Sequence, residues 1–320
     1  MAATIQELII KGFQIYTGNP SSGLKEKIEM IASHHGTISS FLRGRKTDFD
    51  KLVFKVDNPK FKLTEKNYSK IEAFQNSGLL IAELSIQENF IRILTNHFIS
   101  KQLLMIENLG LETLNINPIL SGALNLNNET DLIRYYTYQA ISRSIVTSVG
   151  FLVQNLLLYS SDCVFEGKND DLGDETKWDL VVKKLDQVKA YLEIKSGTND
   201  VDKAQIHHYI REIEFIEEQG YKAYIGETYG KRENQTVTHS LYESYLPDWG
   251  NRTLIGKELW EFVSGQPDYH IRLMDNLFET SSAFMANDSL IKKIEEKISP
   301  LVDDFRRKYE TYDNFMKSLW

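Results

Sequence analysis

The chain has 320 residues, of which 42% are hydrophobic and 26% are charged, and its formal net charge is −8. This composition is that of an ordinary globular protein with one large or two modest domains, and it excludes disordered and collagen-like chains. The acidic balance argues against a surface that attracts nucleic acid everywhere, although it allows a local basic patch. Cys163 is the single cysteine, so there is no internal disulfide and no thiolate cluster for zinc. A metal in this chain would sit on oxygen ligands.

The hydropathy pattern predicts a cytoplasmic protein. No segment reaches the roughly 18 uncharged apolar residues of a membrane span, and the first residues lack the order of a signal peptide. The tail from Asp288 to Trp320 has an amphipathic pattern that predicts two helices broken near Pro300. We expect this tail to serve packing or dimer contact rather than membrane binding.

The chain from Thr4 to about Leu158 has mostly helical apolar spacing, which predicts an α-helical layer. Asn117 and Pro118 interrupt it, and a further helix is expected from about Asp131 to Tyr159. Between Arg43 and Lys70 nine basic residues stand against four acidic ones, whereas the segment from Asp162 to Lys177 is acidic. Charge runs of this kind usually form solvated faces or loops. We expect the acidic segment to be a mobile loop that orders with its ligands, rather than a source of metal ligands such as Glu166 or Asp174.

The residue pattern changes from helical to strand-like spacing at Trp178. Residues 178–185 and 188–197 are rich in apolar, β-branched and aromatic side chains, and a short polar turn around Asp186 and Gln187 joins them, so they predict a hairpin. Residues 200–220 have helical spacing and end at Gly220, and residues 221–230 predict a third strand. The predicted order is helix, hairpin, helix, strand.

Glu193 and Lys195 lie in the middle of the second hairpin strand. Successive side chains of a strand alternate between faces, so these two share one face while Leu192 and Ile194 point the other way. The pattern of an acid followed by any residue and a lysine recurs at Glu166, Glu175 and Glu295, but those copies fall in polar loops or on a helix. Charges in a buried strand cost several kcal/mol unless a specific partner engages them. The pair at Glu193 is therefore the one that predicts a function.

Asp179 stands fourteen positions before Glu193, near the start of the partner strand. The hairpin can bring it to the face that carries Glu193 and Lys195. Two carboxylates and a lysine at the mouth of a small sheet make a site for a hard cation, because magnesium prefers oxygen ligands and keeps several waters for chemistry.

Asp179, Glu193 and Lys195 on a hairpin flanked by helices resemble the PD-(D/E)xK nuclease superfamily, which includes most type II restriction endonucleases. Trp178 stands where the motif has proline. The resemblance implies that Asp179, Glu193 and the carbonyl of Ile194 hold one or two Mg²⁺ ions, and that Lys195 orients and helps to deprotonate the attacking water. Many members add a glutamate on the preceding helix, where this chain offers Gln154. Gln205 and Tyr209 resemble a QxxxY element, although a solvent-facing Gln beside a core Tyr explains the same spacing.

The fold that this resemblance implies is a mixed α+β nuclease core, with a small central mixed sheet flanked by helices. We expect a mostly helical region at 1–140, the nuclease core at 141–270 and C-terminal helices at 271–320. Side chains that contact phosphates and base edges should surround the core. The candidates are Arg43, Arg45, Lys46, Arg143, Gln154, Gln205, Lys231 and Arg232, although for any one of them a solvated surface position is the favoured explanation.

We therefore expect a Mg²⁺-dependent type II restriction endonuclease of a prokaryotic cytoplasm, which cuts double-stranded DNA as a homodimer. Two strands to cut and one site per chain favour two-fold pairing. A repair or recombination nuclease of the same superfamily is the first alternative. The second is a non-catalytic DNA-binding protein in which Asp179, Glu193 and Lys195 form only a buried ion network.

Overall fold

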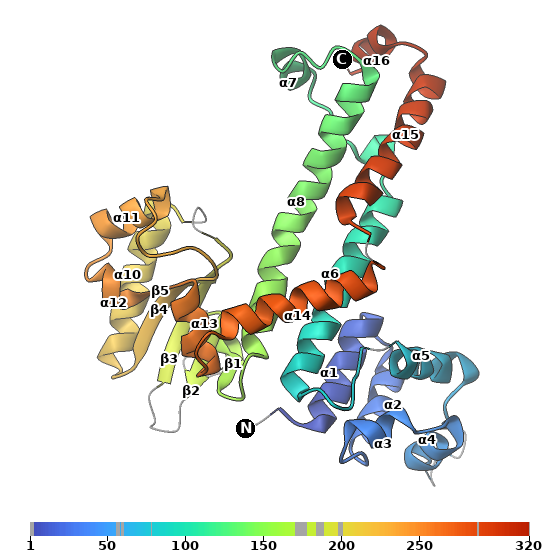
Figure 1. Ribbon diagram of the computed structural model, residues 1–320, viewed down its shortest axis with the longest axis vertical. Coiled ribbons are helices and arrows are strands. Elements are labelled where there is room, and N and C mark those ends of the chain that lie inside the picture. The colour runs from blue at the N-terminus through green and yellow to red at the C-terminus, as the bar shows by residue number, and fades with distance from the viewer. Residues whose placement is uncertain are drawn as a thin grey trace. The chain divides into compact units, whose positions relative to one another are not determined.

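The computed structural model describes residues 3–55, 58, 61–77, 79–169, 178–183, 189–197, 201–286 and 288–319 (Figure 1). Contacts between Cα atoms divide the chain into two compact units. Unit 1 comprises Met1–Thr95 and Gly150–Phe278, and unit 2 comprises Asn96–Val149 and Glu279–Trp320. The three functional regions expected from the sequence remain a prediction, because this division follows contacts alone.

The first part of unit 1 is helical, as its spacing predicts. Its helices are α1 (Ile5–Thr17), α2 (Ser22–Ala32), α3 (Ile38–Leu42), α4 (Lys46–Val53), α5 (Glu65–Asn76) and the start of α6 (Ile86–Glu107). Thr4 begins α1 with a capping box, in which its side chain accepts from Glu7 N and the Glu7 side chain accepts from Thr4 N. Phe13, Phe41, Phe49 and Phe74 are fully buried in the core that these helices share.

Among the described residues, unit 1 also holds a five-stranded mixed sheet with the strand order β1-β2-β3-β4-β5. Its strands are β1 (Val164–Glu166), β2 (Leu180–Lys183), β3 (Lys189–Lys195), β4 (Lys222–Glu227) and β5 (Thr253–Ile255). β1, β2 and β3 pair antiparallel, whereas β4 is parallel to both β3 and β5. The predicted hairpin is confirmed, with Leu180 opposite Leu192; its turn around Asp186 and Gln187 lies outside the described residues.

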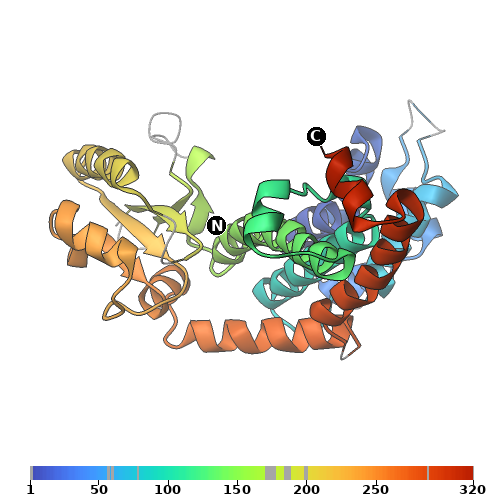
Figure 2. The same ribbon diagram turned by 90° about the horizontal axis from the view of Figure 1, so that it is seen from above.

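Helices cover both faces of the sheet (Figure 2). Val181, Tyr191 and Ile225 pack against α10 (Lys203–Glu218) and α11 (Val237–Tyr245). Leu180, Leu192 and Ile194 pack on the opposite face, against the end of α8 (Glu129–Leu158), α13 (Lys257–Ser264) and the start of α14 (Tyr269–Phe284). The short α12 (Trp249–Arg252) precedes β5. Because β3, β4 and β5 are parallel, their carboxyl ends meet at one edge of the sheet.

The acidic segment contains more order than its composition predicts. Val164–Glu166 forms the edge strand β1, paired with β2, and Gly167–Asn169 forms a short 3-10 turn. A strand of three residues is too short to show alternation, so its charged neighbours dominate the pattern. The expectation of a loop from residue 162 is therefore wrong for this strand, and residues 170–177, which include Asp174, lie outside the described part of the chain.

Unit 2 is a separate helical body. It contains the second half of α6, α7 (Pro118–Ala123), the first part of α8, the end of α14, α15 (Leu290–Tyr309) and α16 (Tyr312–Ser318), with a 3-10 turn at Leu111–Thr113. Leu132, Tyr136, Ile298 and Phe305 are buried in its core. Ion pairs join Arg134 to Glu295 at 3.3 Å and Arg306 to Glu129 at 2.8 Å.

The predicted break near Pro300 is wrong. α15 continues through Pro300 and ends at Tyr309, where Glu310 takes a φ of 62°. A proline inside a helix costs about 3 kcal/mol, because it removes one hydrogen bond and crowds the preceding turn. Ile294, Ile298, Leu301 and Phe305 are buried along one side of α15, and burying side chains of this size stabilises by roughly 1.5–3 kcal/mol each. Packing therefore outweighs the local penalty.

Among the described helices, α8 is the one that is long and apolar enough to cross a membrane, and 17% of its most apolar part is buried. Length and apolar composition do not by themselves identify a membrane span, since core helices of globular proteins share both features. Its charged Arg143 lies within the apolar part, and the helix takes part in the cores of both units.

Candidate active site

Glu193 and Lys195 meet on the face of β3 that α10 covers. Lys195 Nζ lies 2.8 Å from Glu193 Oε1, and their side chains are 14% and 21% exposed respectively. Tyr209, on α10, donates its hydroxyl hydrogen bond to the same Glu193 oxygen at 3.2 Å, and Lys195 Nζ lies 5.1 Å from the centre of the Tyr209 ring. Strand alternation and one helix therefore bring an acid, an ammonium group and a phenol together.

Asp179 lies next to this pair. It precedes Leu180, and continuing the register of β2 and β3 by one residue sets it opposite Glu193. Its Oδ2 accepts from the backbone N–H of Ile194 at 2.8 Å, and its Oδ1 accepts from Gln154 Nε2 at 2.8 Å. The carboxylate is therefore held in one orientation from both sides.

Electrostatics makes Asp179 unusual. Burial raises the pKa of its carboxyl to about 6, and the negative charge of Glu193 adds to the rise, against the hydrogen bonds from Ile194 and Gln154 and the charge of Lys195. An ionised Asp179 is therefore costly without a further cation. A raised pKa in a carboxylate beside another carboxylate is typical of functional sites.

For the pKa of Lys195, in contrast to that of Asp179, the neighbouring groups outweigh the effect of burial. Burial lowers the pKa of its amine, but the hydrogen bonds and charge of Glu193 and Tyr209 outweigh burial and raise it to about 12. Lys195 is thus an ammonium ion at neutral pH. It can donate hydrogen bonds to water or to a phosphate oxygen, but while Glu193 holds it, it cannot accept a proton.

A family model described as type II restriction endonuclease EcoO109I matches residues 85–283. The chain belongs to this family. Its mixed α+β fold agrees with that of restriction endonucleases, and no curated protein matches the chain. The family implies a DNA substrate and generally uses a divalent metal. The match spans β1 to β5, so it contains Asp179, Glu193 and Lys195.

The donor atoms of this restriction endonuclease fit a hard divalent cation. Asp179 and Glu193 offer carboxylate oxygens, which such ions prefer. Each Asp179 oxygen keeps a second lone pair beyond its one hydrogen bond, and Glu193 Oε2 accepts none in the described part of the chain. The cost of ionising Asp179 is itself relieved by a nearby cation. Asp179, Glu193 and the Ile194 carbonyl are the groups that would hold it.

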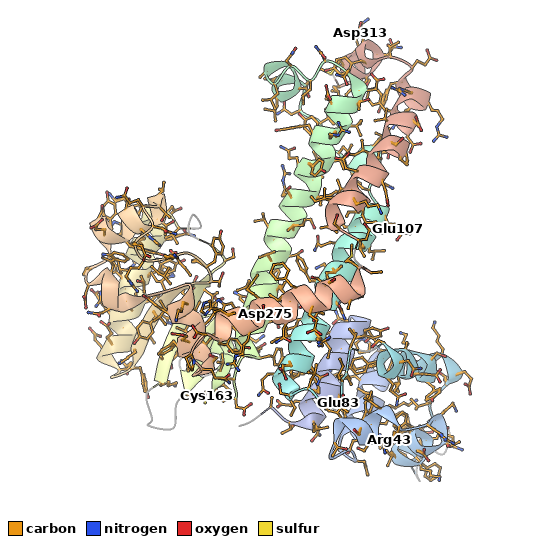
Figure 3. The ribbon with its side chains drawn as sticks, in the orientation of Figure 1. Arg43, Glu83, Glu107, Cys163, Asp275 and Asp313 are labelled. Atoms are coloured by element: carbon orange, nitrogen blue, oxygen red, sulfur yellow. The ribbon has the colours of Figure 1, made fainter. Side chains whose placement is uncertain are left out.

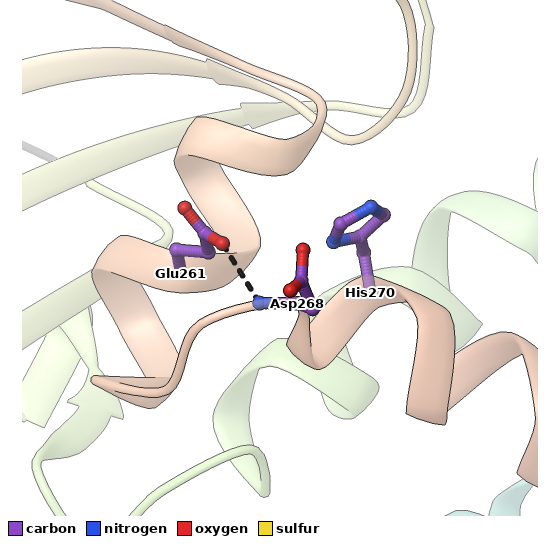
Figure 4. A group of neighbouring side chains, drawn as sticks. All are labelled: Glu261, Asp268 and His270. Atoms are coloured by element: carbon purple, nitrogen blue, oxygen red, sulfur yellow. Dashed lines mark hydrogen bonds between the residues drawn. The ribbon is translucent and has the colours of Figure 1, made fainter.

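The endonuclease has a second cluster of ligand atoms in its described residues, formed by Glu261, Asp268 and His270 (Figure 4). Its potential ligand atoms lie within 4.8 Å of one another. However, Lys257 Nζ already contacts Asp268 at 2.9 Å and Glu261 at 3.4 Å, and Glu261 also accepts from Asp268 N. The lysine supplies the positive charge there, so this cluster reads as an ion-pair network that joins α13 to α14.

Two predicted DNA contacts of the endonuclease have structural partners. Gln205 closes a capping box with Asp202 at the start of α10, through two hydrogen bonds of 2.8 Å. Arg232 donates to Glu258 at 3.2 Å and to Thr253 Oγ1 at 2.9 Å, and its guanidinium lies 5.2 Å from the centre of the Trp249 ring. Lys231, its neighbour, is exposed. The DNA-binding role of each stays a prediction.

The other predicted contacts are more scattered. Arg43, which follows α3 (Figure 3), and Arg45, which precedes α4, are exposed. Lys46 pairs with Asp50 at 2.9 Å and with Glu65 at 3.5 Å. Arg143 is exposed on the part of α8 that belongs to unit 2. Gln154, by contrast, is in the candidate active site, because it orients Asp179. Its amide occupies the position where the resemblance places a glutamate.

Tyr209 is a site residue that its sequence pattern does not single out. Its spacing from Gln205 is the available signal, but a core tyrosine on an amphipathic helix gives the same pattern. The structure places only the tyrosine of that pair beside Glu193.

Proposed function

We propose that this chain is a magnesium-dependent, sequence-specific type II restriction endonuclease in which Asp179, Glu193 and Lys195 form the active site. The family membership supports cleavage of DNA. The observation that carries the assignment to these residues is the half-buried group of two carboxylates and an ammonium ion where β2 begins and β3 ends.

The proposed roles follow from the contacts. When bound, a divalent cation would supply Lewis acidity, which activates water and offsets charge on the phosphate. Gln154 and the Ile194 N–H orient Asp179, and Tyr209 fixes Glu193. The Lys195 ammonium donates to the attacking water or to a non-bridging phosphate oxygen. Fixed donors of this kind stabilise charge that develops in the transition state.

We also propose a homodimer. Cutting both strands of a near-symmetric site with one active site per chain favours two-fold pairing. Ile271, Met274 and Phe278 lie at helical spacing on α14 and are 52%, 46% and 66% exposed. Exposed apolar stripes often mark protein contacts. Sedimentation equilibrium is expected to give twice the mass of the chain, and a monomer that cuts both strands would contradict the dimer.

The test of the function is incubation of the purified protein with unmethylated plasmid or phage DNA, in Mg²⁺ and in EDTA. Discrete fragments that need Mg²⁺ are expected from the wild type and from Lys297→Ala, whose lysine belongs to the same tripeptide pattern elsewhere. Lys195→Ala should give none. A smear would favour a repair or recombination nuclease, and intact DNA from every source would overturn the assignment.

A further inference from the structure

An aromatic side chain stands at the sheet edge that carries the active site. Tyr229 follows β4, whose carboxyl end lies beside that of β3, with Glu227 in register with Lys195. Its side chain is 61% exposed, and its hydroxyl makes no hydrogen bond within the described chain. In open sheets with parallel strands, ligands bind at the carboxyl ends of the strands.

The phenol lies against the strand end next to Lys195. A Cβ atom on Gly197 would collide with the Tyr229 hydroxyl and with its Cζ and Cε1 atoms. Gly197 is two residues beyond Lys195, which corresponds to about 7 Å along an extended strand. The absence of a side chain at Gly197 therefore lets the phenol lie against the backbone that follows the active-site lysine.

The backbone around Tyr229 is held firmly. Thr228 N donates to Lys195 O at 3.2 Å, and Thr228 Oγ1 donates to Ser196 O at 2.9 Å. Trp260 Nε1 donates to Thr228 O at 2.8 Å. On the other side, a Cβ on Gly256 would clash with Gly230 O, so these two backbones pack directly.

A large aromatic side chain held exposed on a rigid backbone is already ordered before a ligand binds, so binding loses less conformational entropy. Tyrosine hydroxyls are among the side-chain donors that bind DNA phosphates and so fix the register of a protein on the duplex. Lys231, in the same loop, adds an exposed positive charge, whereas Arg232 is engaged by Glu258 and Thr253.

We propose that Tyr229 is a DNA-positioning residue, whose hydroxyl donates a hydrogen bond to a backbone phosphate close to the one cut at Lys195. This inference rests on the proposed nuclease function. The hydroxyl is neutral, so its contact adds affinity without releasing counterions. Lys231 differs, because a lysine on a phosphate contributes to the salt dependence of binding.

Tyr229→Phe isolates the hydroxyl, because it keeps the ring on Gly197. Cleavage of plasmid DNA in Mg²⁺ is expected to slow about tenfold, the loss typical of a hydrogen bond to a charged group. Binding of a fluorescein-labelled duplex in EDTA, followed by anisotropy between about 50 and 200 mM salt, should weaken with an unchanged salt slope. Lys231→Ala should reduce that slope by about one. Tyr16→Phe, on α1, controls for loss of a phenol elsewhere.

The outcomes separate the two proposals. If Tyr229→Phe cuts and binds like the wild type while Tyr229→Ala loses stability in urea, Tyr229 only packs on Gly197 and the inference is overturned. If the wild type binds DNA without cutting and Tyr229→Phe weakens that binding, the contact stands and the proposed function fails. A wild type that neither binds nor cuts overturns both.

Discussion

Replacing Asp179 with asparagine is expected to stabilise the metal-free protein while it abolishes DNA cleavage. Burial and the charge of Glu193 raise the pKa of Asp179 from 3.8 to about 6. One pKa unit corresponds to about 1.4 kcal/mol, so keeping Asp179 ionised costs the folded state about 3 kcal/mol. Asparagine carries no charge and avoids this cost.

The hydrogen bonds of Asp179 survive this substitution. An asparagine oxygen can accept from Ile194 N, as Oδ2 does now. Its amide N–H₂ would face Gln154, which can rotate its own amide by 180° and accept through Oε1. The variant therefore removes the charge while both hydrogen bonds at this position can still form.

The sign of the pH dependence follows from the two pKa values. Above pH 6 Asp179 is ionised in both the folded and the unfolded protein. The folded wild type is then destabilised by the full cost of the buried charge, and the stability gained by the variant is greatest. Below the unfolded value of 3.8 both states carry the proton and the advantage disappears. Stability gained at neutral pH should thus be lost as the pH falls from about 6 to about 4.

Urea denaturation in EDTA at pH 8 and pH 4 measures this difference. Glu193→Gln is the matched control, and its effect on stability should have the opposite sign. It removes the negative charge that pairs with the half-buried Lys195 ammonium at 2.8 Å. We expect it to lower the free energy of unfolding by about 1–3 kcal/mol. An Asp179→Asn protein that is no more stable than the wild type at pH 8, or equally stabilised at pH 4, would refute the reasoning.

Three further substitutions test other parts of the structure. Tyr209→Phe should lower kcat about tenfold with DNA binding unchanged, since it removes a hydrogen bond to Glu193. A kcat equal to that of the wild type would exclude a positioning role for Tyr209. Tyr245→Phe is the control. His239→Ala removes a buried ring 3.0 Å from Glu227, so the free energy of unfolding in urea should fall by about 2–4 kcal/mol, whereas exposed His207→Ala should change it little. Pro300→Ala should raise the free energy of unfolding by about 1–3 kcal/mol, because α15 already continues through this exposed position. An unchanged free energy of unfolding would mean that the surrounding packing depends on the proline.

The sequence predicts the centre of this protein best. β3 combines strand alternation with two charges, so the hairpin and the shared face of Glu193 and Lys195 follow from local rules. β1 and β5 have three residues each, which is too few for a period to show, and their pairing comes from the tertiary structure. Pro300 shows the same limit, since local propensity opposes the helix and the core of unit 2 maintains it.

Side-chain partners are the second limit. A composition count treats Lys231 and Arg232 alike, yet the guanidinium of Arg232 binds Glu258 and Thr253, residues more than twenty positions away in the chain. Tyr209 shows the converse, because helical spacing marks it as a core residue and only its contact with Glu193 on the sheet face below makes it part of the site.

The division of the chain has a consequence for how such enzymes can exchange parts. The boundary between units 1 and 2 is crossed three times, within α6, α8 and α14. Neither unit is a continuous stretch of sequence, so a single recombination event cannot transplant unit 2 into a relative. An exchange needs three matched junctions, each inside a helix where one inserted residue turns the following side chains by about 100°. Variation within each unit should therefore accumulate by point substitution rather than by shuffling of whole segments.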